Sequence, residues 1–406
     1  MAYQFIDGSV TAAKGFKASG IHCGIRKNKS KRDIGLIFCE KKCTAAAVYT
    51  TNLVQSSPIT ITRKNLADGY AQAVIVNSGN ANTCNADGDI KAQQMCDLTA
   101  NALGISAADV IVASTGVIGQ ILPIEPIENA IPTLAAELSE NGATNAAEAI
   151  MTTDTVKKEV AVETTIGGKT VKIGGISKGS GMIHPNMATM LCFVTTDAAI
   201  SSEMIQKAVK TAADDTFNMI SIDGDTSTND TLSVMASGLA GNEEITAEGE
   251  DYDSFVEALT AVCRELSKKM AKDGEGATKL LVCKVNGAKT EKDAKGVAKS
   301  VICSSLLKAA MFGADANWGR VLCAIGYSGS DVDVHKVDVS FASDKEKIDV
   351  CKNGAGIEFS EEIAKEILIR DEIDIIVELN DGDSYAEAYG CDLTYDYVKI
   401  NGDYRT

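Results

Sequence analysis

The sequence has few of the residues that build metal sites. It contains only three histidines, His22, His184 and His335, and none of them has ligand spacing. Its twelve cysteines form no CxxC pair. A metal site is therefore not expected. Several cysteines lie in apolar stretches such as 280–283, so we expect reduced, buried thiols in a cytoplasmic protein.

Long apolar runs are also missing. No stretch of about 18 apolar residues occurs, so no transmembrane helix is expected. The N-terminus has neither the basic region nor the apolar core of a secretory signal, which again favours a cytoplasmic location. The net charge of −17 disfavours non-specific binding to nucleic acid or anionic membrane, because both carry charge of the same sign. With 45% hydrophobic residues, the 406-residue chain is typical of a soluble globular protein.

Apolar strands alternate with amphipathic helices along the chain, which predicts an α/β protein of layered sheets and helices. Residues 240–254 are acidic and lack a core pattern, and we interpret them as a surface excursion. A hairpin is predicted across Gly167-Gly168, from strands 157–165 and 170–173. Other strands are predicted at 33–38, 45–49, 73–76, 280–285, 348–350 and 373–379, and helices at 89–103, 124–138, 145–151, 202–213, 255–272, 294–312 and 361–369.

The most informative stretch is Lys178-Gly-Ser-Gly-Met-Ile-His-Pro-Asn-Met-Ala-Thr-Met-Leu191, near the middle of the chain. A glycine-containing loop here leads into an apolar run, and Thr189 lies where the two meet. Peptide cleavage between Ala188 and Thr189 would free an α-amine beside the threonine hydroxyl. That amine could act as the base that activates the oxygen. From the pattern alone, a threonine that merely favours β structure is the commoner case.

This stretch resembles the cleavage site of the ornithine acetyltransferase family, also called bifunctional glutamate N-acetyltransferase/amino-acid acetyltransferase. The resemblance covers nearly the whole chain. It implies a self-cleaving fold of the N-terminal-threonine nucleophile type, with Thr189 as the catalytic nucleophile. It also implies an alpha chain, 1–188, and a beta chain, 189–406, that assemble as an α2β2 heterotetramer.

An oxyanion site is suggested by Ser114-Thr115-Gly116, which follows the apolar run just after Asp109. A threonine hydroxyl and a glycine amide beside a nucleophile can donate to a developing oxyanion. The spacing alone does not establish this role. The resemblance implies it for Thr115 and Gly116.

Substrate-binding residues are suggested by two further motifs. The hydroxyls of Met151-Thr-Thr-Asp-Thr155 can bind a polar ligand or cap and turn the chain. The resemblance implies that a threonine here holds substrate, and we predict Thr152, with Thr153 as the near alternative. Glu275 lies between two glycines, where it could bind a substrate ammonium, while Gly274 offers the simpler interpretation of a helix C-cap.

Lys178 could bind a substrate carboxylate as a point charge, although most lysines lie at the surface. The resemblance implies substrate binding by Lys178, Glu275, Thr189 itself, and Asn401 and Thr406 near the C-terminus. His184 is interpreted as structural. Arg320 could clamp a carboxylate or serve in packing.

The implied reaction is ping-pong transfer of an acetyl group from N2-acetyl-L-ornithine to L-glutamate in arginine biosynthesis, through acetyl-Thr189. No cofactor is expected, and the sequence leaves open whether acetyl-CoA is a second acetyl donor. A self-cleaved amidohydrolase or aminopeptidase of the same architecture is the alternative. A third hypothesis is an uncleaved amino-acid-binding protein.

Overall fold

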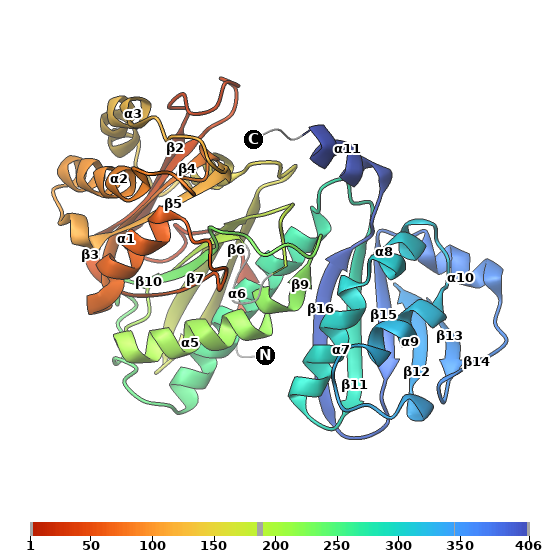
Figure 1. Cartoon of the computed structure of the whole chain (residues 1–406). Coiled ribbons are helices and arrows are strands. Elements are labelled where there is room, and N and C mark those ends of the chain that lie inside the picture. Colours follow the sequence, from red (N-terminus) through yellow and green to blue (C-terminus); the bar gives the residue numbers. More distant parts are fainter. Residues whose placement is uncertain (1–2, 185–189, 345, 404–406) are drawn as a thin grey trace.

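The computed structural model describes residues 3–184, 190–344 and 346–403. Two β-sheets lie side by side, and helices pack on both (Figure 1). The predicted α/β architecture of layered sheets and helices is confirmed. In the described part of the chain, no helix is long and apolar enough to cross a membrane.

The larger sheet has nine strands in the order β1-β6-β7-β8-β10-β3-β4-β5, with β2 paired to β3. Most neighbours are antiparallel, whereas β4 with β5 and β8 with β10 are parallel. Lys178, the last residue of β7, pairs with Leu191, the first residue of β8. The strands are β1 (Tyr3–Ile6), β2 (Phe16–Ile21), β3 (Ile34–Tyr49), β4 (Tyr70–Asn80), β5 (Val110–Val117), β6 (Lys158–Ile166), β7 (Lys169–Lys178), β8 (Leu191–Thr196) and β10 (Thr231–Ala236).

The smaller sheet has seven strands in the order β14-β13-β12-β15-β11-β16-β9. Strands β11 and β15 are parallel, and β11 runs antiparallel to β16. The strands are β9 (Ile220–Ser221), β11 (Leu280–Ala288), β12 (Asp338–Ser343), β13 (Glu346–Lys352), β14 (Ala355–Gly356), β15 (Glu372–Glu378) and β16 (Ser384–Cys391).

One hydrophobic core joins the two sheets. It contains Val194 and Val234 of the larger sheet and Leu280 and Tyr389 of the smaller one, together with Leu266 of α6. Helix α6 therefore packs where the sheets meet. The helices are α1 (Ser57–Asn65), α2 (Gly88–Leu103), α3 (Ile124–Ala136), α4 (Ala143–Ile150), α5 (Ser202–Asp215), α6 (Glu250–Lys272), α7 (Glu291–Cys303), α8 (Ser305–Phe312), α9 (Trp318–Gly326), α10 (Glu361–Leu368) and α11 (Tyr395–Asp403).

Several predicted elements differ from the structure. The strands predicted at 33–38 and 45–49 form the single strand β3, whose exposed residues 40–42 lie at a register shift against β4. The helix predicted at 294–312 divides at Ser304, whose hydroxyl caps α8 by accepting from the Leu307 amide at 3.2 Å. Helix α6 begins at Glu250, inside the predicted excursion, because acidic residues stabilise the first turn of a helix.

Candidate active site

Segments far apart in sequence meet at one cavity. All predicted site residues that the structure describes line it, and so does the alternative residue Thr153. Ala188, Thr189 and Thr406 lie outside the described residues. The predicted residues in the lining are Thr115, Gly116, Thr152, Lys178, Glu275 and Asn401.

A smaller adjoining cavity lies at the start of β8. It shares Thr115 and Lys178 with the first cavity and is also lined by Met190, the residue after Thr189. The Met190 carbonyl accepts from the Thr231 amide at 2.8 Å, which anchors the chain at the start of β8. Met190, the residue after Thr189, therefore lines the same cavity as Thr115, one of the two residues predicted to hold the oxyanion.

Gly116 occupies a position that only glycine fits. Its φ is +134°, and a Cβ there would lie 2.4 Å from the carbonyl carbon of Gly79 in the neighbouring strand β4. The end of β5 is therefore held tightly against the end of β4. This close backbone approach leaves the edge of β5 beside the cavity without a side chain at Gly116.

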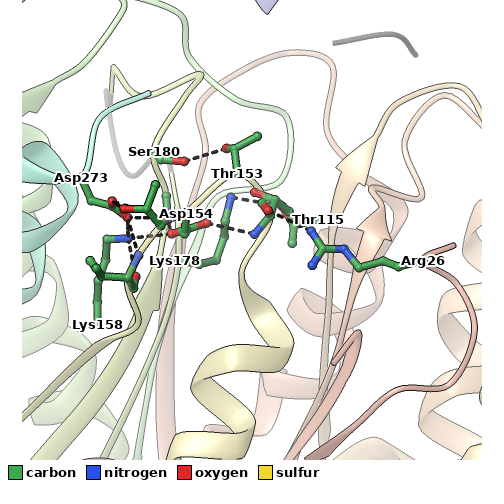
Figure 2. Close-up of polar contacts among 12 residues, drawn as sticks. Arg26, Thr115, Thr153, Asp154, Lys158, Lys178, Ser180 and Asp273 are labelled. Atoms are coloured by element: carbon green, nitrogen blue, oxygen red, sulfur yellow. Dashed lines mark hydrogen bonds and ion pairs between the residues drawn. The ribbon is translucent and has the colours of Figure 1, made fainter. Parts of the chain in front are cut away.

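Thr115 is buried and contacts Lys178 directly. The Lys178 Nζ donates to Thr115 Oγ1 at 3.5 Å, and Figure 2 shows the lysine side chain reaching toward the threonine. A hydroxyl that accepts from an ammonium keeps its own proton for another acceptor. Thr115 can therefore donate to an oxygen of a ligand in the cavity.

Lys178 is a buried cation at the cavity wall. Burial lowers the pKa of its ammonium, while the carboxylates of Asp154, Asp230 and Glu275 raise the pKa and Lys158 lowers it further. Among the described residues, no carboxylate lies within ion-pair distance of Lys178 Nζ. The site therefore suits a ligand that brings its own carboxylate.

Glu275 supplies an anionic group in the same cavity. Its amide donates to the Ser180 carbonyl at 2.7 Å, and its Oε2 accepts from Asn401 Nδ2 of α11 at 2.8 Å. Lys178 and Glu275 together present one positive and one negative group. That pair is complementary to the carboxylate and amino group of an amino acid.

Comparison with known proteins identifies the family. A sequence profile of the ArgJ family matches residues 17–406. The chain belongs to the ArgJ family. It is 49% identical over 404 residues to the arginine biosynthesis bifunctional protein ArgJ of Caldanaerobacter subterraneus subsp. tengcongensis. The match covers 99% of this chain and 100% of that protein. The resemblance found in the motifs is thereby confirmed.

Two further ArgJ proteins show the extent of the likeness. The protein of Bacillus subtilis is 48% identical over 403 residues, covering 99% of this chain and 97% of that protein. A crystal structure of the arginine biosynthesis bifunctional protein argJ from Bacillus halodurans is 48% identical, with a TM-score of 0.50. The match covers 98% of that solved chain but only 52% of this one.

Replacing Gly181 by alanine is expected to weaken substrate binding without unfolding this ArgJ-family chain. A Cβ at Gly181 would lie 2.4 Å from the Glu275 carboxylate carbon, so the end of that side chain must move out of the site. Loss of one charge-assisted contact raises KM by roughly tenfold to a hundredfold. Steady-state kinetics and thermal unfolding measure the two effects.

Gly326→Ala in α9 is the matched control, because a Cβ there meets nothing within 4 Å. It is expected to leave KM unchanged and not to lower Tm, because alanine is the better helix former. A Gly181→Ala enzyme with the wild-type KM would show that the position of Glu275 does not matter for binding.

Asn229 holds the site together, a role that the sequence analysis did not identify. Its Nδ2 donates to the carbonyls of Ala81 and Ser114, both at 2.7 Å. Its Oδ1 accepts from the hydroxyls of Thr83 at 2.8 Å and Thr228 at 2.6 Å. The end of β5, the loop after β4 and the loop before β10 are thereby fixed to one another.

Among the described residues, no cluster of potential metal ligands occurs.

His184 and Arg320 take structural positions. His184 Nδ1 lies 3.1 Å from Ser221 Oγ and 3.4 Å from Cys303 Sγ. Burial, with the nearby Lys299 ammonium, lowers the pKa of the imidazole to about 4, so the ring is neutral near pH 7. Arg320 donates to the Leu306 carbonyl at 2.5 Å and does not line the cavity, which favours the packing interpretation.

The cysteines agree in most cases with the expectation of buried thiols. All twelve are free. Most are buried, but Cys84 and Cys323 are exposed. Neither exposed thiol lines the cavity.

Proposed function

We propose that this ArgJ-family enzyme transfers the acetyl group of N2-acetyl-L-ornithine to L-glutamate through acetyl-Thr189. The observation that carries the proposal is the placement of Lys178 and Glu275 in one cavity beside Thr115 and Gly116. Donor and acceptor share an α-amino-acid core. One pocket with a cation for the carboxylate and an anion for an amino group can therefore hold both in turn.

The first half-reaction forms the acetyl-enzyme. The Thr189 oxygen attacks the acetyl carbonyl, and the α-amine of Thr189 takes its proton. The Thr115 hydroxyl and the Gly116 amide donate to the resulting oxyanion. The C–N bond then breaks, the leaving amine of ornithine takes the proton, and the acetyl group remains as an ester on Thr189.

The second half-reaction returns the enzyme to its starting state. The amine of glutamate attacks the ester carbonyl, and the same two donors hold the oxyanion. Collapse releases N-acetylglutamate and gives the proton back to the Thr189 oxygen. Since ornithine leaves before glutamate reacts with acetyl-Thr189, one binding site suffices.

Cleavage between Ala188 and Thr189 is part of the proposal. The Thr189 oxygen would attack the Ala188 carbonyl, and water would open the ester. The solved argJ chain of Bacillus halodurans supports this, because it matches only 52% of the present chain while being 98% covered itself. Residues 189–406 make up about 54% of the sequence. We further propose an α2β2 assembly of the two chains in the cytoplasm.

Acetyl-CoA is proposed as a second acetyl donor. The curated relatives are named bifunctional, which supports an activity beside ornithine-dependent transfer. Acetyl-CoA is the donor that fits the same covalent route, because its thioester also carries an acetyl carbonyl that the Thr189 oxygen can attack. Formation of N-acetylglutamate from acetyl-CoA and glutamate, without acetylornithine, tests this activity.

Intact-mass spectrometry before and after addition of N2-acetyl-L-ornithine tests the main proposal. We expect two fragments that meet between Ala188 and Thr189, and one acetyl group gained by the fragment that begins with Thr189. Addition of L-glutamate is expected to remove that acetyl group as N-acetylglutamate. A single chain that never gains an acetyl group would overturn the proposal, and release of free acetate without glutamate would favour the amidohydrolase alternative.

A further inference from the structure

Three charged residues lie buried together behind the wall of the cavity. Lys158 Nζ is 2.7 Å from Asp154 Oδ1 and 2.6 Å from Asp273 Oδ2 (Figure 2). The side chains of Asp154 and Lys158 are 0% exposed and that of Asp273 is 6% exposed. None of the three lines the cavity that holds Lys178 and Glu275. We call Asp154, Lys158 and Asp273 the buried triad.

The two carboxylates of the triad also bind backbone amides. Asp154 accepts from the Gly179 amide at 2.7 Å and from the Thr152 amide at 3.0 Å. Asp273 accepts from the Thr155 amide at 3.1 Å. The triad thus connects the segment that carries Thr152 to the residue after Lys178 and to the turn before Glu275.

Direct contacts between the same segments complete this platform. Thr153 Oγ1 lies 2.6 Å from Ser180 Oγ, and the Glu275 amide donates to the Ser180 carbonyl at 2.7 Å. Thr152, Lys178 and Glu275, three of the residues predicted to bind substrate, therefore lie within two positions of a contact made by the triad or by Ser180. A shift of any one segment would move its substrate-binding side chain.

Asp154 also acts on the charge of Lys178. Burial alone would raise the pKa of the Asp154 carboxyl, but the Lys178 and Lys158 ammonium groups hold that pKa well below its usual range. Asp154 is therefore ionised, and it contacts Lys158 directly and the Gly179 amide next to Lys178. The other charged groups that act on Lys178 are Asp230 and Glu275, which favour its protonated form, and Lys158, which opposes it.

We propose that the buried triad adjusts substrate binding: Asp154 fixes the backbone beside Lys178 through the Gly179 amide and keeps Lys178 charged toward the substrate carboxylate, while Lys158, paired with Asp273, competes for Asp154. This inference rests on the proposed function and deepens it. Burial of an ion pair is a weak source of stability, since apolar replacements are often as stable. A role in the site accounts for three buried charges where stability alone does not require them.

The anion and the cation of the triad have opposite effects on the protonation of Lys178. Removing one or the other should therefore shift the pH dependence of substrate binding in opposite directions. Asp154→Asn removes an anion, so Lys178 loses its proton at lower pH and binding weakens at lower pH than in the wild type. The double variant Lys158→Gln with Asp273→Asn removes the competing cation together with its second partner. Asp154 then interacts with Lys178 as its only neighbouring cation of the pair, so Lys178 keeps its proton and binds substrate up to higher pH. Each shift is expected to be about one pH unit.

Ornithine affinity, measured by titration calorimetry across neutral and alkaline pH, tests these shifts directly, and KM for N2-acetyl-L-ornithine is measured in parallel. Asp374→Asn is the control, because Asp374 forms an ion pair with Lys284 at 2.6 Å on the smaller sheet and lines no part of the cavity. The ionisations of ornithine itself are common to all four proteins and cancel in the comparison. Circular dichroism and gel analysis confirm folding and chain cleavage in each variant.

Opposite shifts in the two triad variants, with none in the control, are the expected result. Unshifted profiles, or shifts in the same direction, would overturn the proposal. A triad with only a structural role would not shift the pH profiles of the two variants in opposite directions. If Asp154→Asn does not fold, the double variant decides alone, and an unshifted profile overturns the proposal. An inactive wild type that still binds ornithine would count against the proposed function but not against the triad.

Discussion

Thr189→Ala is expected to yield a single 42.6 kDa chain that transfers no acetyl group. Alanine has no oxygen to attack the Ala188 carbonyl, so the chain is not cut, and none to carry the acetyl group. Loss of a catalytic nucleophile costs on the order of 10⁶-fold in kcat, which removes measurable turnover. Gel electrophoresis reports the cleavage, and formation of N-acetylglutamate reports the transfer.

Thr189→Ser separates the chemistry from the side-chain shape. Serine keeps the oxygen and, after cleavage, the neighbouring α-amine, so cleavage and acetylation are expected to persist at reduced rates. If the alanine variant were still cut between residues 188 and 189, or still carried an acetyl group, another residue would have to be the nucleophile.

Local signals in the sequence predicted most of the elements around this site. The hairpin of β6 and β7 turns at Gly167-Gly168, as predicted, because consecutive glycines accept the positive φ of a tight turn. Helix α2 begins at Gly88, one residue before the predicted start, and ends at Leu103 as predicted. Both elements depend on periodicity and turn chemistry within a short stretch of chain.

Pairing between distant strands left no such signal. Strand β8 lies between β7, its neighbour in sequence, and β10, and only the second contact is parallel. This order brings Lys178 and Leu191 to the same end of the sheet as Thr231. The hydrophobic pattern within one strand does not indicate which distant strand will pair with it.

The residues alone left the roles of the site motifs open, and the structure shows why. In the segment 151–155, the Asp154 carboxylate accepts from the Thr152 amide two residues before it, while Thr152 and Thr153 line the cavity. The segment therefore bends the chain at the wall of the cavity, and substrate binding by Thr152 or Thr153 stays a prediction. The partner of Lys158 at Asp273 is 115 residues away, so the buried triad could not be predicted from spacing.

Thr115→Val is expected to lower kcat by about 10²–10³-fold, the usual effect of removing one oxyanion donor. Valine keeps the branched shape at the end of β5 but has no hydroxyl to donate. The oxyanion develops only during acetyl transfer, so the loss is expected mainly in kcat rather than in KM. Steady-state kinetics with N2-acetyl-L-ornithine and L-glutamate separate the two parameters.

Thr62→Val controls for the loss of a buried threonine hydroxyl in itself. Thr62 Oγ1 donates to the Val112 carbonyl at 2.8 Å and accepts from the Val112 amide at 3.0 Å, but it lines no part of the cavity. Its replacement is expected to lower the free energy of unfolding by about 1–3 kcal/mol and to leave kcat unchanged. A Thr115→Val enzyme with the wild-type kcat would mean that Gly116, with other donors, holds the oxyanion without Thr115.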